Sequence, residues 1–298
     1  MTWKSFEAAP GITRIESVLG PRPFSQYLLH DERSLLVDTG VKETPGEVLL
    51  PALDGLEPDF VLLSHADVDH FGGNSAIREA APAAVFCAHT ADAGWIESRE
   101  LILRERYGWY DEYGIGYDAD TFAWLRDAMG EDVPVDLRLQ GGEVFRLGPA
   151  LSVEILYLPG HSPGHVGVWD PASRSAIVQD AVMGRGLLDT DGNVIHPPPL
   201  VDLAGAERSA RLLLELHPEH LLTSHYAVME GDEVTAFLEQ TIDFVERARK
   251  VVRSHADLPL RELLAQGDAE LGPFTSMPNE LAATLRAGLQ EAGLKARP

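Results

Sequence analysis

Short apolar runs separated by Gly, Pro and charged turns recur along the chain, and between several of them lie stretches of helical composition. The apolar runs predict strands over residues 12–16, 26–30, 34–37, 60–63, 83–87, 151–157, 174–178 and 221–223. The other stretches predict helices over residues 74–81, 203–216, 233–252, 259–266 and 278–291. Because strands come first and then alternate with helices, we expect an α/β fold in which helices cover β-sheets.

A further helix is predicted directly before the strand at residues 60–63. Thr44 is expected to be its N-cap, Pro45 its first helical residue, and Glu47 the partner that closes a capping box. This helix should run to about Leu53.

Residues 92–136 lose the strand pattern and are expected to be helical. Seven of the 22 aromatic residues of the chain fall between Tyr107 and Trp124, where even spreading predicts about 1.3. We interpret the segment as an insertion that forms a lid, an apolar substrate pocket or a dimer contact. The alternative is that these rings pack into a small core of the insertion itself.

Composition narrows the classes of protein that fit. The chain has 298 residues, 45% of them hydrophobic, and a mean hydropathy of −0.08, which is typical of one large globular domain with embellishments. Its net charge of −23 repels phosphate backbones and argues against nucleic-acid binding. No apolar run approaches the roughly 18 residues that span a membrane, and no leader pattern opens the chain, so we expect a cytoplasmic protein. The one cysteine, Cys87, excludes a disulfide framework and a thiolate zinc finger.

Potential metal ligands lie directly after the strand predicted at residues 60–63. His65, Asp67, Asp69 and His70 stand within six residues, before Gly72 and the next predicted helix. In α/β proteins the carboxyl ends of strands are where ligands bind. Because closely packed carboxylates and imidazoles are costly without a cation to organise them, this loop predicts a metal site.

Three more predicted strands end in the same way. His161 follows the strand at 151–157, Asp180 ends the one at 174–178, and His225 follows the one at 221–223. Seven donors suit two divalent ions that share a bridging carboxylate and a bridging hydroxide. We expect His165 and His196 to line the pocket or to brace a loop. The remaining histidines are expected to lie outside the site: His30, His89, His217, His220 and His255.

Five motifs occur in one order between residues 12 and 228: LVDTG at 36–40, SHADVDHFGGN at 64–74, PGHSPGH at 159–165, QD at 179–180 and SH at 224–225. With them the chain resembles the metallo-β-lactamase-fold hydrolases. The resemblance implies a four-layer αββα sandwich over residues 1–230, with the helical insertion at 92–136, and a C-terminal helical extension at 231–298 that packs on it.

The same resemblance implies the ligand sets. One metal would be bound by His65, Asp67 and His161. The other would be bound by Asp69, His70 and His225. Asp180 would bridge the two, and Asp38 would support the site from behind.

Asp67 departs from the family pattern, which usually has histidine there. With two divalent ions and a hydroxide, the three carboxylates bring the formal charge of the site to zero, whereas the usual site sums to +1. We therefore expect a less electrophilic first metal and a bound water with a raised pKa. Zinc is the metal that the family implies, and the extra oxygen ligand favours manganese or iron.

The favoured function is a binuclear metal-dependent hydrolase. A bridging hydroxide would attack an ester, lactone or thioester carbonyl, or a phosphoester, in a small substrate with an apolar part. Asp69 would orient the hydroxide, and Tyr226 would either donate to the oxyanion or only pack. Two alternatives stay open: a di-iron oxidoreductase on the same fold, which the extra carboxylate permits, and a non-catalytic metal-binding or interaction protein on this scaffold.

Overall fold

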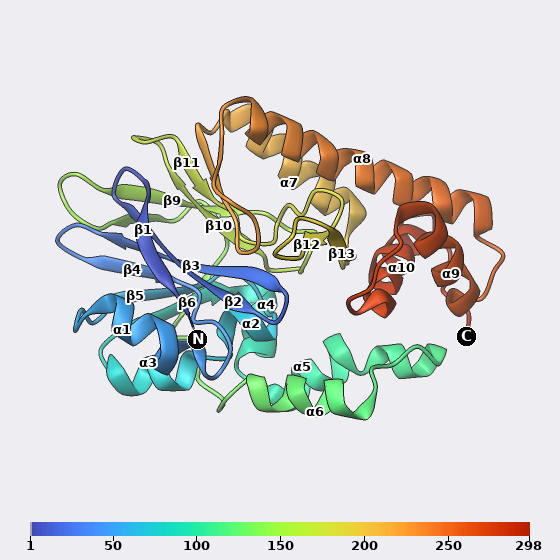
Figure 1. The fold of residues 1–298 in the computed structure, drawn as a ribbon, viewed down its shortest axis with the longest axis horizontal. Helices are drawn as coiled ribbons and strands as arrows, with labels where there is room; N and C mark the ends of the chain where they lie inside the picture. Colours follow the sequence, from blue (N-terminus) through green and yellow to red (C-terminus); the bar gives the residue numbers. More distant parts are fainter. Residues whose placement is uncertain (1) are drawn as a thin grey trace.

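The computed structural model describes residues 2–298. Two β-sheets face each other at its centre, with helices on both outer sides (Figure 1). The first sheet has seven strands in chain order: β1 (Lys4–Ala9), β2 (Ile12–Leu19), β3 (Arg22–His30), β4 (Ser34–Val37), β5 (Phe60–Leu63), β6 (Val85–His89) and β7 (Leu137–Leu139). Its strands are antiparallel from β1 to β4 and parallel from β4 to β7.

The second sheet has six strands. Their spatial order is β15 (Met229–Glu230), β14 (His220–Leu222), β11 (Ser175–Ile177), β10 (Val166–Asp170), β9 (Ser152–Tyr157) and β8 (Val144–Arg146). Only β11 and β14 are parallel neighbours. A separate small hairpin consists of β12 (Leu187–Leu188) and β13 (Val194–His196).

The core between the sheets is built from the inward side chains of both. Tyr27 and Leu62 come from the first sheet, Ile155 and Val168 from the second, and each is at most 1% exposed. Such alternation of inward and outward residues is what holds two sheets face to face.

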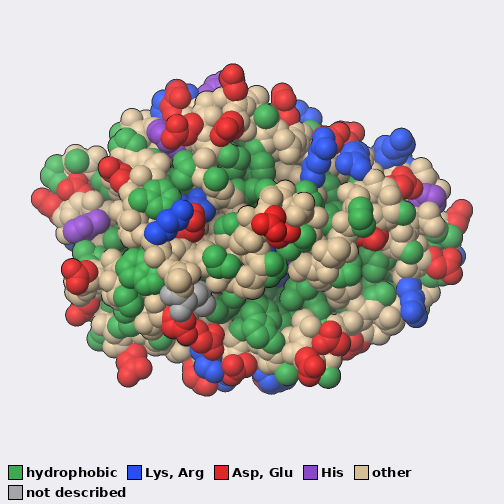
Figure 2. All heavy atoms as spheres, viewed as in Figure 1, with side chains coloured by type: hydrophobic (Ala, Val, Ile, Leu, Met, Phe, Trp, Pro, Cys, Tyr) green, Lys and Arg blue, Asp and Glu red, His purple; other side chains and the backbone are tan. Residues whose placement is uncertain are grey.

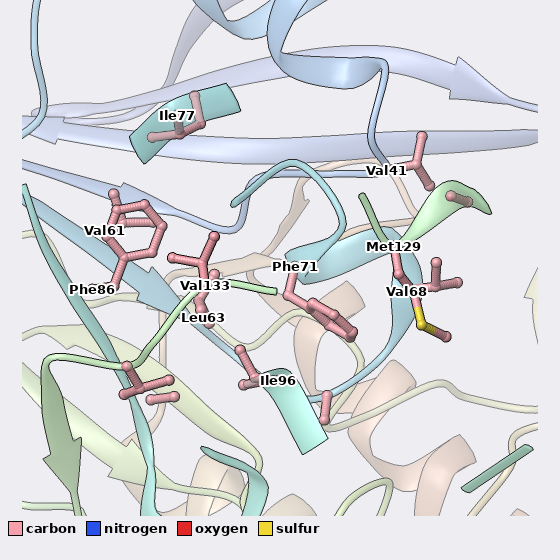
Figure 3. Close-up of a cluster of buried hydrophobic side chains, with 14 of the residues drawn as sticks. Val41, Val61, Leu63, Val68, Phe71, Ile77, Phe86, Ile96, Met129 and Val133 are labelled. Atoms are coloured by element: carbon pink, nitrogen blue, oxygen red, sulfur yellow. The ribbon is translucent and has the colours of Figure 1, made fainter. Parts of the chain in front are cut away.

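Helices bury the outer face of the first sheet. In chain order they are η1 (Pro45–Leu49), α1 (Leu50–Leu53), α2 (Val68–Phe71), α3 (Asn74–Ala80), α4 (Thr90–Ile96), α5 (Arg99–Ile102), η2 (Leu103–Tyr107) and α6 (Ala119–Ala128). The helical turn η3 (Trp109–Tyr113), between η2 and α6, belongs to a different apolar cluster. Figure 3 shows part of this layer, where Phe71 and Ile96 lie beside Leu63 of β5.

The outer face of the second sheet is covered by α7 (Leu203–Leu216) and α8 (Asp232–His255), whose Leu213 and Leu238 share a cluster with Leu221 of β14. The four-layer αββα arrangement expected from the sequence is therefore confirmed. After α8 come α9 (Leu260–Leu271), η4 (Pro278–Glu280) and α10 (Leu281–Glu291).

These C-terminal helices contact the insertion. Tyr110 of η3 belongs to the same apolar cluster as Phe244 of α8, Leu260 of α9 and Leu281 at the start of α10. The rings of the insertion therefore do not form a closed core of their own, because part of their surface is buried by the end of the chain.

Several local predictions were wrong or incomplete, and no strand was expected from the sequence at β1, β7, β8, β10, β12, β13 or β15. Thr44 makes no side-chain capping bond, and its Oγ1 instead accepts a hydrogen bond from the backbone N–H of Val41, so there is no capping box and the segment starts as a π-helical turn. Strand β10 was not expected, because its buried residues do not alternate and a glycine interrupts them. A Cβ on Gly167 would lie 2.7 Å from the carbonyl oxygen of Ile177, so the strand requires glycine there.

The surface fits the composition. Acidic side chains are spread over the face in Figure 2 and do not gather in one patch, as expected if the charge mainly serves solubility. Within residues 2–298 no helix is long and apolar enough to cross a lipid bilayer.

Candidate metal centre

Six of the seven predicted ligands fall into two groups of three. One contains His65, His161 and Asp180. The other contains Asp69, His70 and His225. In each group one donor atom of every residue lies within 4.8 Å of the others.

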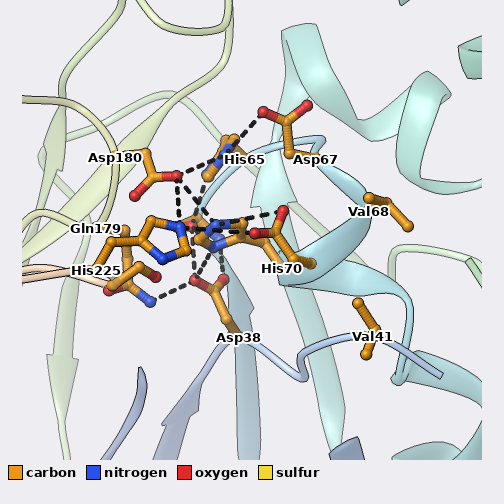
Figure 4. A network of polar contacts seen from close by, with 12 residues as sticks. Asp38, Val41, His65, Asp67, Val68, His70, Gln179, Asp180 and His225 are labelled. Carbon is orange, nitrogen blue, oxygen red and sulfur yellow. Dashed lines mark hydrogen bonds and ion pairs between the residues drawn. The ribbon is translucent and has the colours of Figure 1, made fainter. Parts of the chain in front are cut away.

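The distances between donors match the edges of a coordination shell. The Nε2 atoms of His70 and His225 lie 3.3 and 3.4 Å from Oδ2 of Asp180, and His225 Nε2 lies 3.6 Å from Oδ2 of Asp69. Two ligands that are each about 2.0–2.2 Å from a tetrahedral ion stand roughly 3.3–3.6 Å apart. The same Asp180 oxygen is 4.0 Å from Nε2 of His65, so it faces both groups, as expected of a bridging carboxylate (Figure 4).

The buried nitrogens lack any other partner. Nε2 of His65, His70 and His225 is buried without a hydrogen bond, which is costly unless an ion satisfies it. Although burial alone would lower it, neighbouring carboxylates beginning with Asp38 hold the pKa of His70 well above its usual value. The carboxylates beside His70 thus favour positive charge there, and the donor set of the two groups fits a pair of divalent ions.

Hydrogen bonds on the opposite ring nitrogens orient the imidazoles. Nδ1 of His70 lies 2.7 Å from Oδ2 of Asp38, and Nδ1 of His225 lies 2.8 Å from the carbonyl oxygen of Pro23. Such bonds place the proton on Nδ1 and leave Nε2 free to bind metal.

Asp38 connects several strand ends. Besides His70, its carboxylate accepts hydrogen bonds from the backbone N–H and hydroxyl of Ser64, at 2.7 and 2.8 Å, and from the amide of Gln179 at 2.5 Å. Asp38 and Gln179 both have positive φ angles, 65° and 45°, which non-glycine residues adopt at a cost of about 1–3 kcal/mol. The surrounding hydrogen bonds hold this strained arrangement.

Two glycines after α2 let the ligand loop lie against its neighbours. A Cβ on Gly72 would lie 2.2 Å from the carbonyl oxygen of Ala128, and one on Gly73 would lie 2.3 Å from that of Thr39. No side chain larger than hydrogen fits either place without displacing backbone. The insertion, to which Ala128 belongs, is thereby packed directly against the loop that carries Asp69 and His70.

The seventh predicted ligand, Asp67, has partners that the sequence did not reveal. The guanidinium of Arg106, in η2, donates hydrogen bonds to both carboxylate oxygens of Asp67, and its Nη2 lies 2.7 Å from Oδ2. The Tyr107 hydroxyl donates to Oδ1 of Asp67 at 3.0 Å. Oδ2 also lies 2.8 Å from Nε2 of His161 and 3.5 Å from that of His65. Burial opposes ionisation, but Arg106 and these histidines hold the pKa of Asp67 well below its usual range.

Arg106 changes the charge argument. Its guanidinium places one positive charge against Asp67, so the carboxylate that replaces histidine is neutralised from the insertion side. When Arg106 is counted together with the ligands, ions and hydroxide, the sum returns to +1, and the reason for expecting a less electrophilic first metal is removed.

Asp92 was also missed. This buried residue of α4 accepts hydrogen bonds from the backbone N–H of Ala66 at 3.0 Å, from the hydroxyl of Ser162 at 2.5 Å and from the N–H of Gly164 at 2.7 Å. It therefore ties the loop after β5 to the loop that carries His161. Its place three residues after β6 is the one signal that the sequence offers, and the helical composition from residue 92 onward obscured that signal.

Comparison with known proteins identifies the fold family. The model of the metallo-beta-lactamase superfamily matches residues 19–225. The chain belongs to this superfamily.

Relatives in the superfamily are distant in sequence. The chain is 27% identical over 216 residues to a probable metallo-hydrolase, YqgX, of Bacillus subtilis, covering 72% of this chain and 86% of that protein. It is 26% identical over 180 residues to a hydroxyacylglutathione hydrolase of Fuscovulum blasticum, covering 59% of this chain and 66% of that protein. A metallo-beta-lactamase family protein from Thermus thermophilus has a similar structure, with a TM-score of 0.70, 18% identity and coverage of 96% and 95%. A beta-lactamase domain protein from Burkholderia ambifaria is also similar in structure, with a TM-score of 0.72 and 20% sequence identity. The match covers 97% of this chain and 88% of that protein.

In this metallo-beta-lactamase fold the donors open onto one cavity of about 250 Å³. Asp69, Asp180, His161 and His225 form its floor. Its walls are formed by aromatic side chains of the insertion, by Met277 directly before η4, and by residues of η4 and α10. The insertion and these C-terminal elements contribute Trp95, Tyr107, Trp109, Tyr110, Tyr117, Trp124, Glu280 and Arg286. The insertion is thus a wall of the cavity.

Three further residues can now be placed. The hydroxyl of Tyr226 lies 2.7 Å from both the Met183 and Gly186 carbonyl oxygens, and the residue is not part of the cavity lining. Since its one proton is shared by two acceptors, Tyr226 packs, and the oxyanion role is not supported. His165 stacks on His65 at 4.5 Å and braces it. His196 lines the cavity and pairs with Glu280 at 3.1 Å.

Proposed function

We propose that the protein is a binuclear metal-dependent hydrolase that cleaves an ester, lactone or thioester of a small substrate with an apolar part. The observation that carries this proposal is the set of buried, unpartnered Nε2 atoms that face Asp180 at the floor of an aromatic-walled cavity. Two divalent ions bound there would supply an activated water and polarise the substrate carbonyl.

The chain contributes position and proton transfer. Asp69 is 9% exposed and lines the cavity, so one of its oxygens can hold the proton of the attacking water while the other faces His225. The aromatic walls exclude bulk water and hold the apolar part of the substrate. Asp38 keeps the His70 imidazole in the tautomer that leaves Nε2 unprotonated, and the Pro23 carbonyl does the same for His225.

Hydrolysis is favoured over the oxidoreductase alternative by the state of Asp67. That alternative depended on an additional carboxylate ligand, and this carboxylate forms a fork-shaped ion pair with Arg106. A non-catalytic metal-binding or interaction role is disfavoured because Asp69, Asp180, His161 and His225 open onto a cavity large enough for a substrate.

The test is metal dependence of turnover. Protein stripped with a chelator and reloaded with Zn²⁺ or Mn²⁺ should hydrolyse members of a panel of p-nitrophenyl esters, lactones and thioesters, and the stripped protein should not. Asp180→Asn should lower both metal content, measured by elemental analysis, and turnover, while substitution of the exposed Asp257 by Asn should change neither. Full metal content and full activity in Asp180→Asn would contradict the assignment.

A further inference from the structure

Two arginines of the cavity lack a counter-charge. Arg22, at the start of β3, and Arg286, on α10, both line the cavity and are only partly exposed. Within residues 2–298 neither forms an ion pair, and Nε of Arg22 is buried without a hydrogen bond. Arg286 lies over the ring of Trp109 at 4.4 Å and has no carboxylate partner.

These two are exceptional among the basic residues. In the part of the chain that the structure describes, the other lysines and arginines without an ion pair or side-chain hydrogen bond are exposed to solvent: Arg33, Arg146, Lys250, Arg253, Arg261, Lys295 and Arg297. An exposed cation is satisfied by water. A half-buried one in a chain of net charge −23 keeps its charge at a cost unless an anion arrives.

The acidic residues of the cavity do not supply that anion. Glu105 pairs with Arg104 at 2.8 Å, and Asp67 pairs with Arg106. Glu280 pairs with His196 and accepts a hydrogen bond from the Tyr117 hydroxyl at 2.6 Å. The remaining two, Asp69 and Asp180, face the metal-ligand histidines.

The two guanidinium groups lie on different walls. Arg22 directly precedes Pro23, whose carbonyl holds His225, so it belongs to the wall next to the metal ligands. Arg286 belongs to the wall formed by α10 and Trp109. A planar guanidinium that is held by an aromatic ring and open on its other side is suited to a carboxylate or phosphate.

We propose that Arg22 and Arg286 form an anion subsite, and that the substrate is an ester or thioester that carries a carboxylate or phosphate beside its apolar part. The part of this inference that concerns an ester or thioester substrate rests on the proposed function. The binding of an anion by the two arginines does not depend on it. It assigns the substrate specificity of the cavity to charge as well as to apolar contact.

The binding test uses amides that the enzyme need not cleave. Metal-loaded protein is titrated calorimetrically with 4-nitrosuccinanilic acid, with its neutral isostere 4-nitrobutyranilide, and with 3-phosphonopropionyl 4-nitroanilide. The wild type should bind at least one anionic analogue about tenfold or more tightly than the neutral one. The tighter of the two anionic analogues tells whether the natural group is a carboxylate or a phosphate.

Variants separate the arginines from the metals as the source of the preference. R22Q/R286Q should bind acid and neutral analogue about equally, R22K/R286K should retain part of the preference, and R253Q, which removes an exposed arginine of α8, should behave as the wild type. Equal binding of both analogues by the wild type, or a preference that persists in R22Q/R286Q, would overturn the proposal. Circular dichroism confirms folding of each variant.

Hydrolysis provides the second arm. p-Nitrophenyl hemisuccinate should be cleaved with a lower KM than p-nitrophenyl butyrate, and the difference should vanish in R22Q/R286Q with little change in kcat. If metal-loaded protein cleaves neither ester, that result counts against the hydrolase proposal. The calorimetric titration then still tests the anion subsite on its own. If both are cleaved equally, the reaction stands and the anion subsite is refuted.

Discussion

The ion pair between Arg106 and Asp67 is the clearest place to test the energetics of this site. Its two side chains are only 8% and 15% exposed. Removing one partner of a buried pair costs about 3–5 kcal/mol, because the other charge stays buried without its main counter-charge. We therefore expect Arg106→Met to destabilise metal-free protein by that amount, a decrease of about 5–8 °C in Tm for a chain of this length.

Bound metal should reduce this loss. With Arg106 gone, the Asp67 carboxylate lies 2.8 Å from Nε2 of His161 and 3.5 Å from that of His65, close enough to join the ligands of the first ion. Saturating Zn²⁺ should therefore raise the Tm of Arg106→Met more than that of the wild type. Thermal unfolding with chelator and with Zn²⁺ measures both quantities.

A matched control comes from the same insertion. Arg99 pairs with Glu131 and Asp132, but its side chain is 31% exposed and theirs are 78% and 47% exposed. Arg99→Met should cost less than about 1 kcal/mol with or without metal. If Arg106→Met costs no more than Arg99→Met, or if metal stabilises both variants equally, the reasoning about Asp67 is refuted.

Three other predictions follow from single contacts. Asp38→Asn should weaken metal affinity about 10- to 100-fold, measured against a chelating dye, with tight binding in the variant as the contrary result. Gly72→Ala should cost about 1–3 kcal/mol in urea unfolding, because its Cβ would lie 2.2 Å from a backbone carbonyl oxygen, whereas Gly46→Ala, with nothing within 4 Å, should cost little. Burial raises and His196 lowers the pKa of Glu280, with a net decrease. Its stabilising effect should thus be present above the ordinary Glu pKa of about 4.3 and be lost as the pH falls below it. Unfolding of Glu280→Gln and wild type across this range tests the sign, and a difference that grows toward low pH would contradict it.

The layers of the fold could be predicted because apolar runs, and the turn residues that end them, are local signals in the sequence. Helix α7 was placed at its observed bounds, and the strands around the site within a few residues. Strand β10 could not be predicted, because its identity depends on close contact with β11, which only the folded chain provides. The capping box at Thr44 was predicted from residue types alone. The folded chain gives Thr44 another hydrogen-bond partner, so the capping geometry does not form.

The candidate site divides in the same way. The histidines and aspartates that follow strands could be listed from the sequence, and the structure brings six of them into two groups. Arg106 and Asp92 could not be found, because each contacts residues 26 or more positions away. Arg106 follows no strand, and Asp92 follows β6 but stands at the start of the segment that was predicted to be helical. Asp67 was expected to bind metal without a competitor, and its contact with Arg106 lies outside any local pattern.

The β2–β3 hairpin reaches across to the other half of the sandwich. The Tyr27 hydroxyl donates to the Thr223 carbonyl at 2.6 Å, Arg14 donates to that of Tyr226 at 2.7 Å, and Pro23 holds His225. Each contact joins positions about 200 residues apart, so the second group of donors exists only after the β2–β3 hairpin has met the loop after β14. Metal uptake should therefore be a late event in folding, and a bound ion should slow hydrogen exchange in both sheets together rather than in one loop.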